Sequence, residues 1–78
     1  MTTAIIWSRD NCPYCVQAKN LLTQKGIEIE ERKLGDNWTK EQLLEAVPNA
    51  MSVPQIFIDG EYIGGFSDLR TKFLAEAA

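Results

Sequence analysis

The chain has 78 residues, of which 45% are hydrophobic and 24% are charged, and its formal net charge is −3. This composition is typical of one globular domain and leaves no room for a second. The negative net charge and the lack of a basic cluster argue against nucleic-acid binding, and no apolar run approaches the roughly 20 residues of a membrane span. We therefore expect a soluble, cytoplasmic protein with neither nucleic acid nor membrane as a partner.

The first strand is predicted at residues 3–7, a short run of β-branched and aromatic side chains. A helix is predicted to begin at Cys12-Pro13, because proline suits the first helical position, and to end near Gly26. At 100° per residue, Tyr14 and Cys15 share the expected buried face of this helix, whereas Cys12 lies about 120° from its centre. We therefore expect Cys15 to face the core and Cys12 to be exposed at the start of the helix.

After the first helix, the sequence predicts a second strand, two more helices and a hairpin of two strands. Residues 27–30 alternate with a period of two and predict the second strand of the chain. Thr39 and Gln42 match a capping box and predict the start of a second helix. Residues 55–58 and 61–63 flank Asp59-Gly60, a strong hairpin signal. Ser67 is expected to cap a last helix.

The predicted order of elements is β-α-β-α-β-β-α. The first two strands, joined by a helix, form a parallel unit, and the last two form an antiparallel hairpin. This order predicts an α/β fold with a mixed four-stranded sheet and helices on its faces.

The only two cysteines, Cys12 and Cys15, allow several interpretations. A disulfide between them would close a loop too short to stabilise the fold much. A structural zinc site normally takes four cysteine or histidine ligands, and the chain has no histidine. An iron–sulfur cluster shared between two protomers stays open. A reactive dithiol is the interpretation that the spacing and the composition favour.

The start of the helix favours Cys12 as the attacking thiolate. A free cysteine is about 3% thiolate at pH 7, and lowering its pKa to about 6 requires roughly 3.4 kcal/mol. The helix dipole supplies at most about 2 kcal/mol of this. Backbone amides of the first turn and the charge of Arg9 are the expected additional contributions. We predict that Cys12 attacks an incoming disulfide and that Cys15 then resolves the mixed disulfide.

Four stretches resemble the dithiol glutaredoxins, in order and over nearly the whole chain. They are Cys12-Pro13-Tyr14-Cys15, Ser52-Val53-Pro54, Ile63-Gly64-Gly65 and Ser67-Asp68-Leu69. The resemblance implies the minimal thioredoxin fold, with strand order 2-1-3-4 and three helices, as a single domain over residues 1–78. It implies glutathione-dependent reduction of protein disulfides and of glutathione mixed disulfides, hence roles in electron transport and cell redox homeostasis. It further implies a monomer that uses glutathione as its reductant and needs no metal.

The resemblance also implies a glutathione site. Tyr14 would lie along the glutathione groove, and Val53 would pair its backbone with the tripeptide, next to a cis Pro54. The start of the last helix would receive the γ-glutamyl end, and Arg9 would lie near the glycine carboxylate. The full expected set is Arg9, Tyr14, Ser52, Val53, Pro54, Gly65, Phe66, Ser67 and Asp68.

Other functions remain open at this stage. Ribonucleotide reductase is a frequent client of the family and is one expected protein substrate. A thioredoxin-like electron donor reduced by a flavin reductase is an alternative, although residues 65–68 match the glutathione-binding pattern that such donors usually lack. An iron–sulfur carrier and a nonenzymatic binding module are the remaining alternatives.

Overall fold

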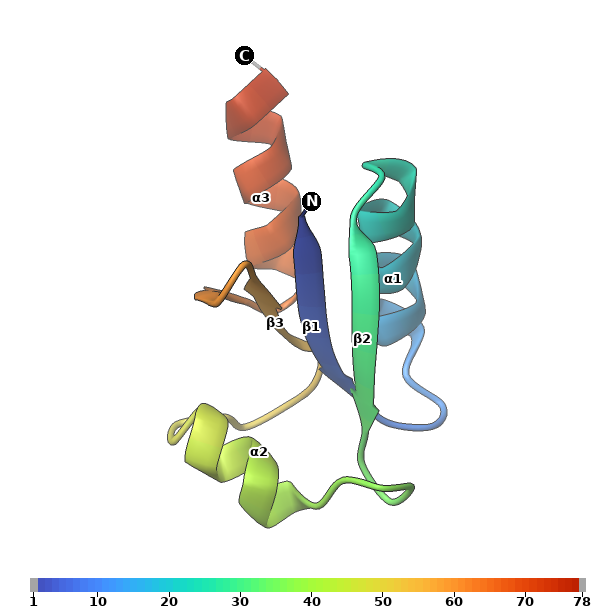
Figure 1. The fold of residues 1–78 in the computed structure, drawn as a ribbon, viewed down its shortest axis with the longest axis vertical. Helices are drawn as coiled ribbons and strands as arrows, with labels where there is room; N and C mark the ends of the chain where they lie inside the picture. The colour runs from blue at the N-terminus through green and yellow to red at the C-terminus, as the bar shows by residue number, and fades with distance from the viewer. Residues whose placement is uncertain (1, 78) are drawn as a thin grey trace.

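The computed structural model describes residues 2–77, which form a four-stranded sheet and three helices (Figure 1). The sheet order is β2-β1-β3-β4, with β1 and β2 parallel and the other two pairs antiparallel. This confirms the predicted order of elements and the mixed sheet. In chain order the elements are β1 (Thr3–Ser8), α1 (Pro13–Gln24), β2 (Glu28–Lys33), α2 (Lys40–Ala46), β3 (Gln55–Ile58), β4 (Glu61–Gly64) and α3 (Phe66–Ala77).

The main core lies between the sheet and the pair α1 and α3. Side chains at alternate positions of β1 point to the same face of the sheet, so Ala4, Ile6 and Ser8 all face these two helices. All three are fully buried. The cluster on this face consists of Ala4, Ile6, Ala18, Leu22, Ile56, Leu69 and Phe73.

A second, smaller cluster connects α2 to the opposite face of the sheet. Trp7 packs there with Leu43 and Val47, and Trp38 lies edge-on to Trp7 with ring centroids 5.3 Å apart. Trp38 precedes the helix and so has the position expected of a hydrophobic staple. This cluster holds α2 beside the loop that leads into β3.

Local sequence signals place the start of α2 and the hairpin as predicted. Thr39 caps α2, and both bonds of the capping box with Gln42 are present. Asp59 and Gly60 have φ angles of 48° and 85°, the positive pair that a tight two-residue hairpin requires. No helix within residues 2–77 is long and apolar enough to cross a membrane.

The prediction that Tyr14 belongs to the buried face of α1 is wrong, since 62% of this residue is exposed. Helical spacing alone put it beside Cys15. However, Tyr14 lies in the first turn of α1, and its ring stacks on Phe66 of α3 instead, with centroids 6.0 Å apart. Tyr14 is therefore held at the surface against α3, one residue before Cys15.

Candidate active site

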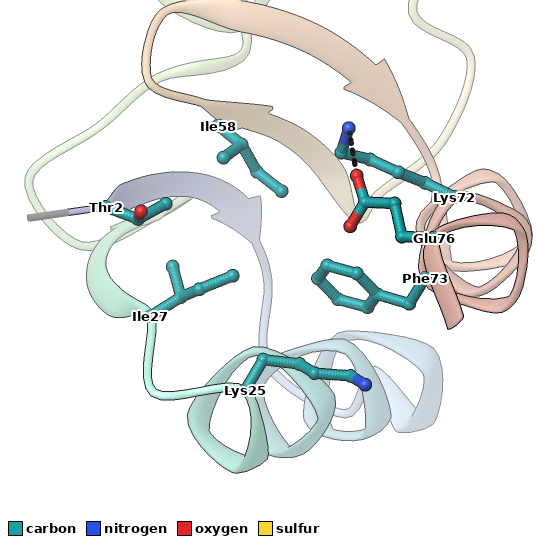
Figure 2. A pocket seen from close by; sticks show the side chains of 7 residues that line it. All are labelled: Thr2, Lys25, Ile27, Ile58, Lys72, Phe73 and Glu76. Atoms are coloured by element: carbon teal, nitrogen blue, oxygen red, sulfur yellow. Dashed lines mark ion pairs between the residues drawn. The ribbon is translucent and has the colours of Figure 1, made fainter. Parts of the chain in front are cut away.

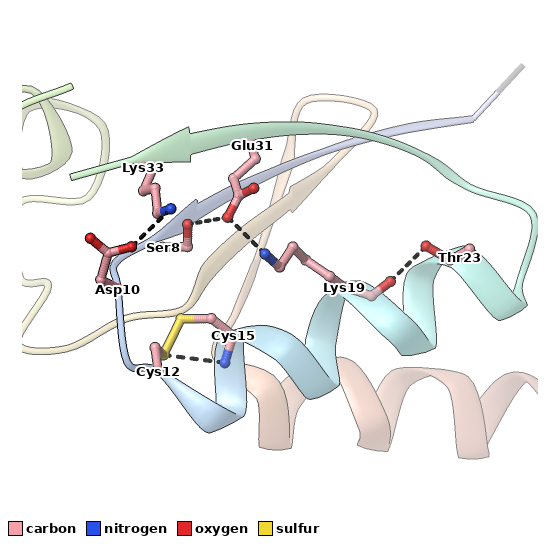
Figure 3. A network of polar contacts seen from close by, with 8 residues as sticks. All are labelled: Ser8, Asp10, Cys12, Cys15, Lys19, Thr23, Glu31 and Lys33. Carbon is pink, nitrogen blue, oxygen red and sulfur yellow. Dashed lines mark hydrogen bonds and ion pairs between the residues drawn. A yellow bond between two sulfur atoms is a disulfide. The ribbon is translucent and has the colours of Figure 1, made fainter. Parts of the chain in front are cut away.

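The two cysteines form a disulfide at the N-terminus of α1, with their Cα atoms 5.2 Å apart (Figure 3). Cys12 is the N-cap residue, and Pro13 opens the helix without needing an amide partner. The amide of Cys15 points at the sulfur of Cys12, with 3.2 Å between N and Sγ. A negative charge on this sulfur would therefore be stabilised by a first-turn amide and by the positive end of the helix dipole.

Burial of the pair agrees with the prediction for Cys15 and contradicts it for Cys12. Cys15 is 1% exposed, as expected of a side chain that faces the core. Cys12 was expected to be exposed, but it is buried, with an exposed fraction of 6%. Its sulfur lies 3.8 Å from the carbonyl oxygen of Val53, so the loop before β3 covers it. The helical-wheel argument considered α1 alone and could not include this loop.

A cavity of about 270 Å³ collects seven of the nine residues that the resemblance assigned to glutathione. Tyr14 and Phe66 contribute aromatic walls, and the Val53–Pro54 peptide bond, which is cis, contributes the side near Cys12. Residues 2–77 contain no backbone hydrogen bond to either the amide or the carbonyl of Val53. The lining residues are Tyr14, Ser52, Val53, Pro54, Gly65, Phe66 and Ser67.

Asp68 lies next to this cavity at the start of α3. Its carboxylate accepts a hydrogen bond of 3.1 Å from the amide of Gly65. Gly65, whose carbonyl accepts the first helical bond from Leu69, occupies the N-cap position. The prediction that Ser67 caps the helix is therefore wrong, because Ser67 as the N-cap would start the helix at Asp68, whereas the helix starts two residues earlier, at Phe66. Asp68 instead reaches back to the cap amide, as the acidic member of a capping box does.

Arg9 lies outside this cavity. Its Nη1 donates to the backbone carbonyls of Asp10 and Asn11 at 3.0 and 3.2 Å. It lines a neighbouring cavity of about 240 Å³ that shares Ser52 and Val53 with the first. Arg9 therefore stands beyond Val53, on the α2 side of it.

A third cavity, of about 470 Å³, is lined by both cysteines and by charged residues that include Lys19, Glu31 and Lys33. Sequence reasoning had not included these three charged residues in the site. The available signal was the strand period, since Glu31 and Lys33 share the parity of the half-buried Ile29 and so face α1. The predicted strand stopped at residue 30, whereas β2 extends to Lys33.

The Glu31 carboxylate makes two short contacts in this cavity (Figure 3). The Ser8 hydroxyl donates to its Oε2 at 2.6 Å, and the Lys19 ammonium lies 2.9 Å from the same atom. The hydrogen bond from Ser8, followed by that from Lys19, lowers the pKa of Glu31 below its ordinary value of 4.5. The ionised form is therefore the one that the folded chain prefers.

This shift predicts a pH-dependent contribution of Glu31 to stability. A carboxyl whose pKa is lower when folded stabilises the fold above the unfolded pKa, and this contribution is lost as the pH falls through the folded pKa. In urea unfolding at pH 7, Glu31→Gln is expected to be less stable than the original chain. The two should approach each other as the pH is lowered through the folded pKa of Glu31, because both side chains then become neutral. A difference in stability that stays the same size as the pH falls would contradict the prediction.

The cavity at the opposite end of the molecule has a different character (Figure 2). It has a volume of about 440 Å³ and lies near the start of β1 and the second half of α3. Phe73 lines it, and so do Lys72 and Glu76, which form an ion pair. It contains none of the predicted site residues. Nowhere in residues 2–77 do three or more histidine, cysteine, aspartate or glutamate side chains gather as a metal site would need.

Known proteins resemble this chain in both sequence and structure. The glutaredoxin family model matches residues 4–63. Glutaredoxin 3 of Escherichia coli (strain K12) is 39% identical over 69 residues, which span 88% of this chain and 83% of that protein.

Solved structures extend the likeness to nearly the whole fold. Glutaredoxin 1 from Francisella tularensis, complexed with cacodylate, has a TM-score of 0.80 at 30% identity, covering 99% of this chain and 98% of that one. A buckwheat glutaredoxin–glutathione complex has a TM-score of 0.82 at 25% identity, covering 96% of this chain and 71% of that one.

Proposed function

Since this chain belongs to the glutaredoxin family and is a thiol–disulfide oxidoreductase by that membership, we propose that glutathione is its reductant. The observation that carries the proposal is the cavity lined by Val53, whose carbonyl oxygen lies 3.8 Å from the sulfur of Cys12. Within residues 2–77, the backbone of Val53 has no backbone hydrogen-bond partner. An extended peptide pairs with such a backbone as an added strand does. The buckwheat relative, a glutaredoxin–glutathione complex, supports the same ligand class.

The charges around Val53 suit the two ends of glutathione. The γ-glutamyl end carries a carboxylate and an ammonium, and we assign it to the start of α3. There the first-turn amides and Ser67 suit the carboxylate, and Asp68 suits the ammonium. We assign the glycine carboxylate to the other side of Val53, where Arg9 and Lys40 line the neighbouring cavity. Sequence reasoning had not included Lys40 in the site.

In the proposed reaction the Cys12 thiolate attacks one sulfur of a substrate disulfide. A mixed disulfide forms and the other substrate sulfur leaves as a thiolate, which takes up a proton. Cys15 then loses its proton and attacks the Cys12 sulfur, which releases the second substrate thiol and leaves the Cys12–Cys15 disulfide. Two molecules of glutathione reduce this disulfide in two further exchanges and leave as glutathione disulfide.

For a glutathionylated protein, we propose that Cys12 attacks the sulfur of the glutathione moiety. The protein thiol is then the leaving group, and a second glutathione completes the cycle by attacking the same sulfur. The stacked rings of Tyr14 and Phe66, which line the cavity, would hold the glutathione moiety there for this attack. We further propose a monomer that acts in the cytoplasm, with ribonucleotide reductase among its protein substrates.

The test is the reduction of a glutathionylated peptide, followed with two reducing systems in parallel. We expect turnover with glutathione plus glutathione reductase and NADPH, and little turnover with thioredoxin reductase and NADPH. A preference for thioredoxin reductase would contradict the proposal and favour the thioredoxin-like electron donor. A chain that reduces the peptide with neither system would contradict both.

A further inference from the structure

The cavity behind the disulfide contains more charge than the reaction proposed above uses. Besides the cysteines it is lined by three cationic residues, Arg9, Lys19 and Lys33, and by the carboxylates of Asp10 and Glu31. A cysteine thiolate is stabilised by nearby cations and destabilised by nearby carboxylates. The arrangement of these charges therefore affects how readily Cys12 ionises.

Both lysines in this cavity are held by a carboxylate of their own. Lys19 lies 2.9 Å from Glu31, and Lys33 lies 2.8 Å from Asp10. Arg9 directs its Nη1 at backbone carbonyls. Neither ammonium is therefore left to pair with a cysteine sulfur alone.

The pair of Lys19 and Glu31 is fixed more firmly than the other. Ser8 is fully buried at the end of β1, and its hydroxyl donates to the same oxygen of Glu31 that contacts Lys19. A buried hydroxyl on a core-facing strand position needs such a partner. By contrast, the Asp10 side chain is 78% exposed.

Helix geometry places the pair of Lys19 and Glu31 beside the resolving cysteine. Lys19 follows Cys15 by four residues on α1, so the two side chains lie on the same face of the helix, one turn apart. Glu31 reaches this face from β2 across the end of β1 (Figure 3). The network thus joins β1, β2 and α1 in the cavity that both cysteines line.

We propose that Glu31, anchored by Ser8, keeps the dithiol reducing by holding the Lys19 ammonium and opposing the Cys12 thiolate. A dithiol whose thiolate is strongly stabilised is a better oxidant, because its reduced form is favoured. Glu31 limits this stabilisation in two ways. Its charge repels the thiolate, and its ion pair holds the Lys19 ammonium. Glu31 is a positioning residue, since it acts on Cys12 by its charge and through Lys19. The inference rests on the proposed function in one respect, namely that a reductant benefits from a less stabilised thiolate.

The test measures two properties of Glu31→Gln that a merely structural residue would not shift. The first is the pKa of Cys12, followed by thiolate absorbance or by the pH dependence of alkylation. The second is the equilibrium with dithiothreitol at a pH above that pKa. Glutamine retains the shape of the side chain and an oxygen for the Ser8 hydroxyl. We expect the pKa of Cys12 to fall by about half a unit, and the equilibrium to move about threefold toward the dithiol, or roughly 14 mV.

Three further variants make the outcome unambiguous. Lys19→Gln should shift both quantities in the opposite direction, and the double variant should return close to the original values. Asp10→Asn should follow the sign of Glu31→Gln with a smaller effect, because its pair is solvent-exposed. Unchanged values in a folded Glu31→Gln variant, or shifts of the same sign in Lys19→Gln and Glu31→Gln, would overturn the proposal. Should Glu31→Gln fail to fold, the direction in which Lys19→Gln shifts the pKa of Cys12 decides. A fall instead of a rise would overturn the proposal.

This experiment is independent of glutathione recognition. Dithiothreitol reduces the disulfide whether or not the chain binds glutathione. A chain that shows the expected shifts but does not reduce a glutathionylated peptide would retain this inference and lose the proposed function. A chain that reduces the peptide but whose variants show no shifts would retain the proposed function and lose this inference.

Discussion

Cys12→Ser is expected to lower every thiol–disulfide exchange rate by about 10³-fold or more, to the background of free glutathione, because serine cannot supply the attacking thiolate. The geometry distinguishes Cys12 from its partner. Its sulfur lies close to Val53, which lines the proposed glutathione cavity, and accepts a hydrogen bond from the amide of Cys15. Cys15 is 1% exposed, against 6% for Cys12, so we expect an incoming disulfide to meet Cys12 first.

Cys15→Ser is the matched control, because it removes the second sulfur and leaves the first. Reduction of a glutathionylated peptide should stay within about tenfold of the original rate, since that cycle needs one cysteine and free glutathione. Reduction of a protein disulfide should fall much further. The unresolved mixed disulfide on Cys12 should then accumulate and be visible by mass spectrometry.

Equal losses in the two variants, with both folded by circular dichroism, would contradict the division of roles. Full cellular function of the Cys12→Ser variant would be a different result, because it would favour the nonenzymatic binding module over any oxidoreductase. An assay in vitro together with complementation in a strain lacking its own glutaredoxins separates these outcomes.

Local signals were sufficient to predict most of the fold. Pro13 after Cys12, the pair of Thr39 and Gln42, and Asp59-Gly60 each fix a helix start or a turn through contacts within four residues. The hairpin and the parallel unit then leave few ways to order the strands. The end of β2 was harder to predict, since Glu31 to Lys33 are charged, as residues of a loop would be.

What the sequence alone could not predict depends on contacts between distant segments. Cys12 is covered by Val53, a residue 41 positions away, so its burial follows from the tertiary fold. Ser8 and Glu31 meet only because β1 and β2 pair in one register, with Ile6 opposite Glu31. A shift of one residue would turn Glu31 to the other face of the sheet. By contrast, the residues that line the proposed glutathione cavity were named by resemblance, which carries tertiary information that periodicity does not.

Gly64→Ala is expected to cost about 3 kcal/mol of stability, because it combines backbone strain with a collision. Gly64 has a φ of 118°, which an alanine adopts only at a cost. A Cβ at this position would also lie 2.8 Å from Cγ of Asp68, too close for the carboxylate to stay where it is. The displaced carboxylate would lose its hydrogen bond from the amide of Gly65, the N-cap residue of α3.

The same displacement should affect the ligand, since Gly65 and Ser67 line the proposed glutathione cavity. We expect Gly64→Ala to raise the KM for a glutathionylated peptide about tenfold, the equivalent of one charged hydrogen bond, with a smaller change in kcat. The readouts are urea unfolding and steady-state kinetics at saturating glutathione reductase. An unchanged KM would contradict the assignment of the γ-glutamyl end to the start of α3.

Two controls separate strain from collision. Gly60 has a φ of 85° in the hairpin, but a Cβ there would meet no atom within 4 Å. Gly60→Ala should therefore cost only about 1–2 kcal/mol, the penalty of a left-handed alanine, and should leave the KM unchanged. Combining Gly64→Ala with Asp68→Ala removes the carboxylate that the new Cβ would strike. The double variant should consequently lose less stability than the sum of the two single variants, because adjacent substitutions that share a contact are not additive. Additive losses would show that Asp68 is not what makes alanine costly at this position, and would leave backbone strain as the whole cause.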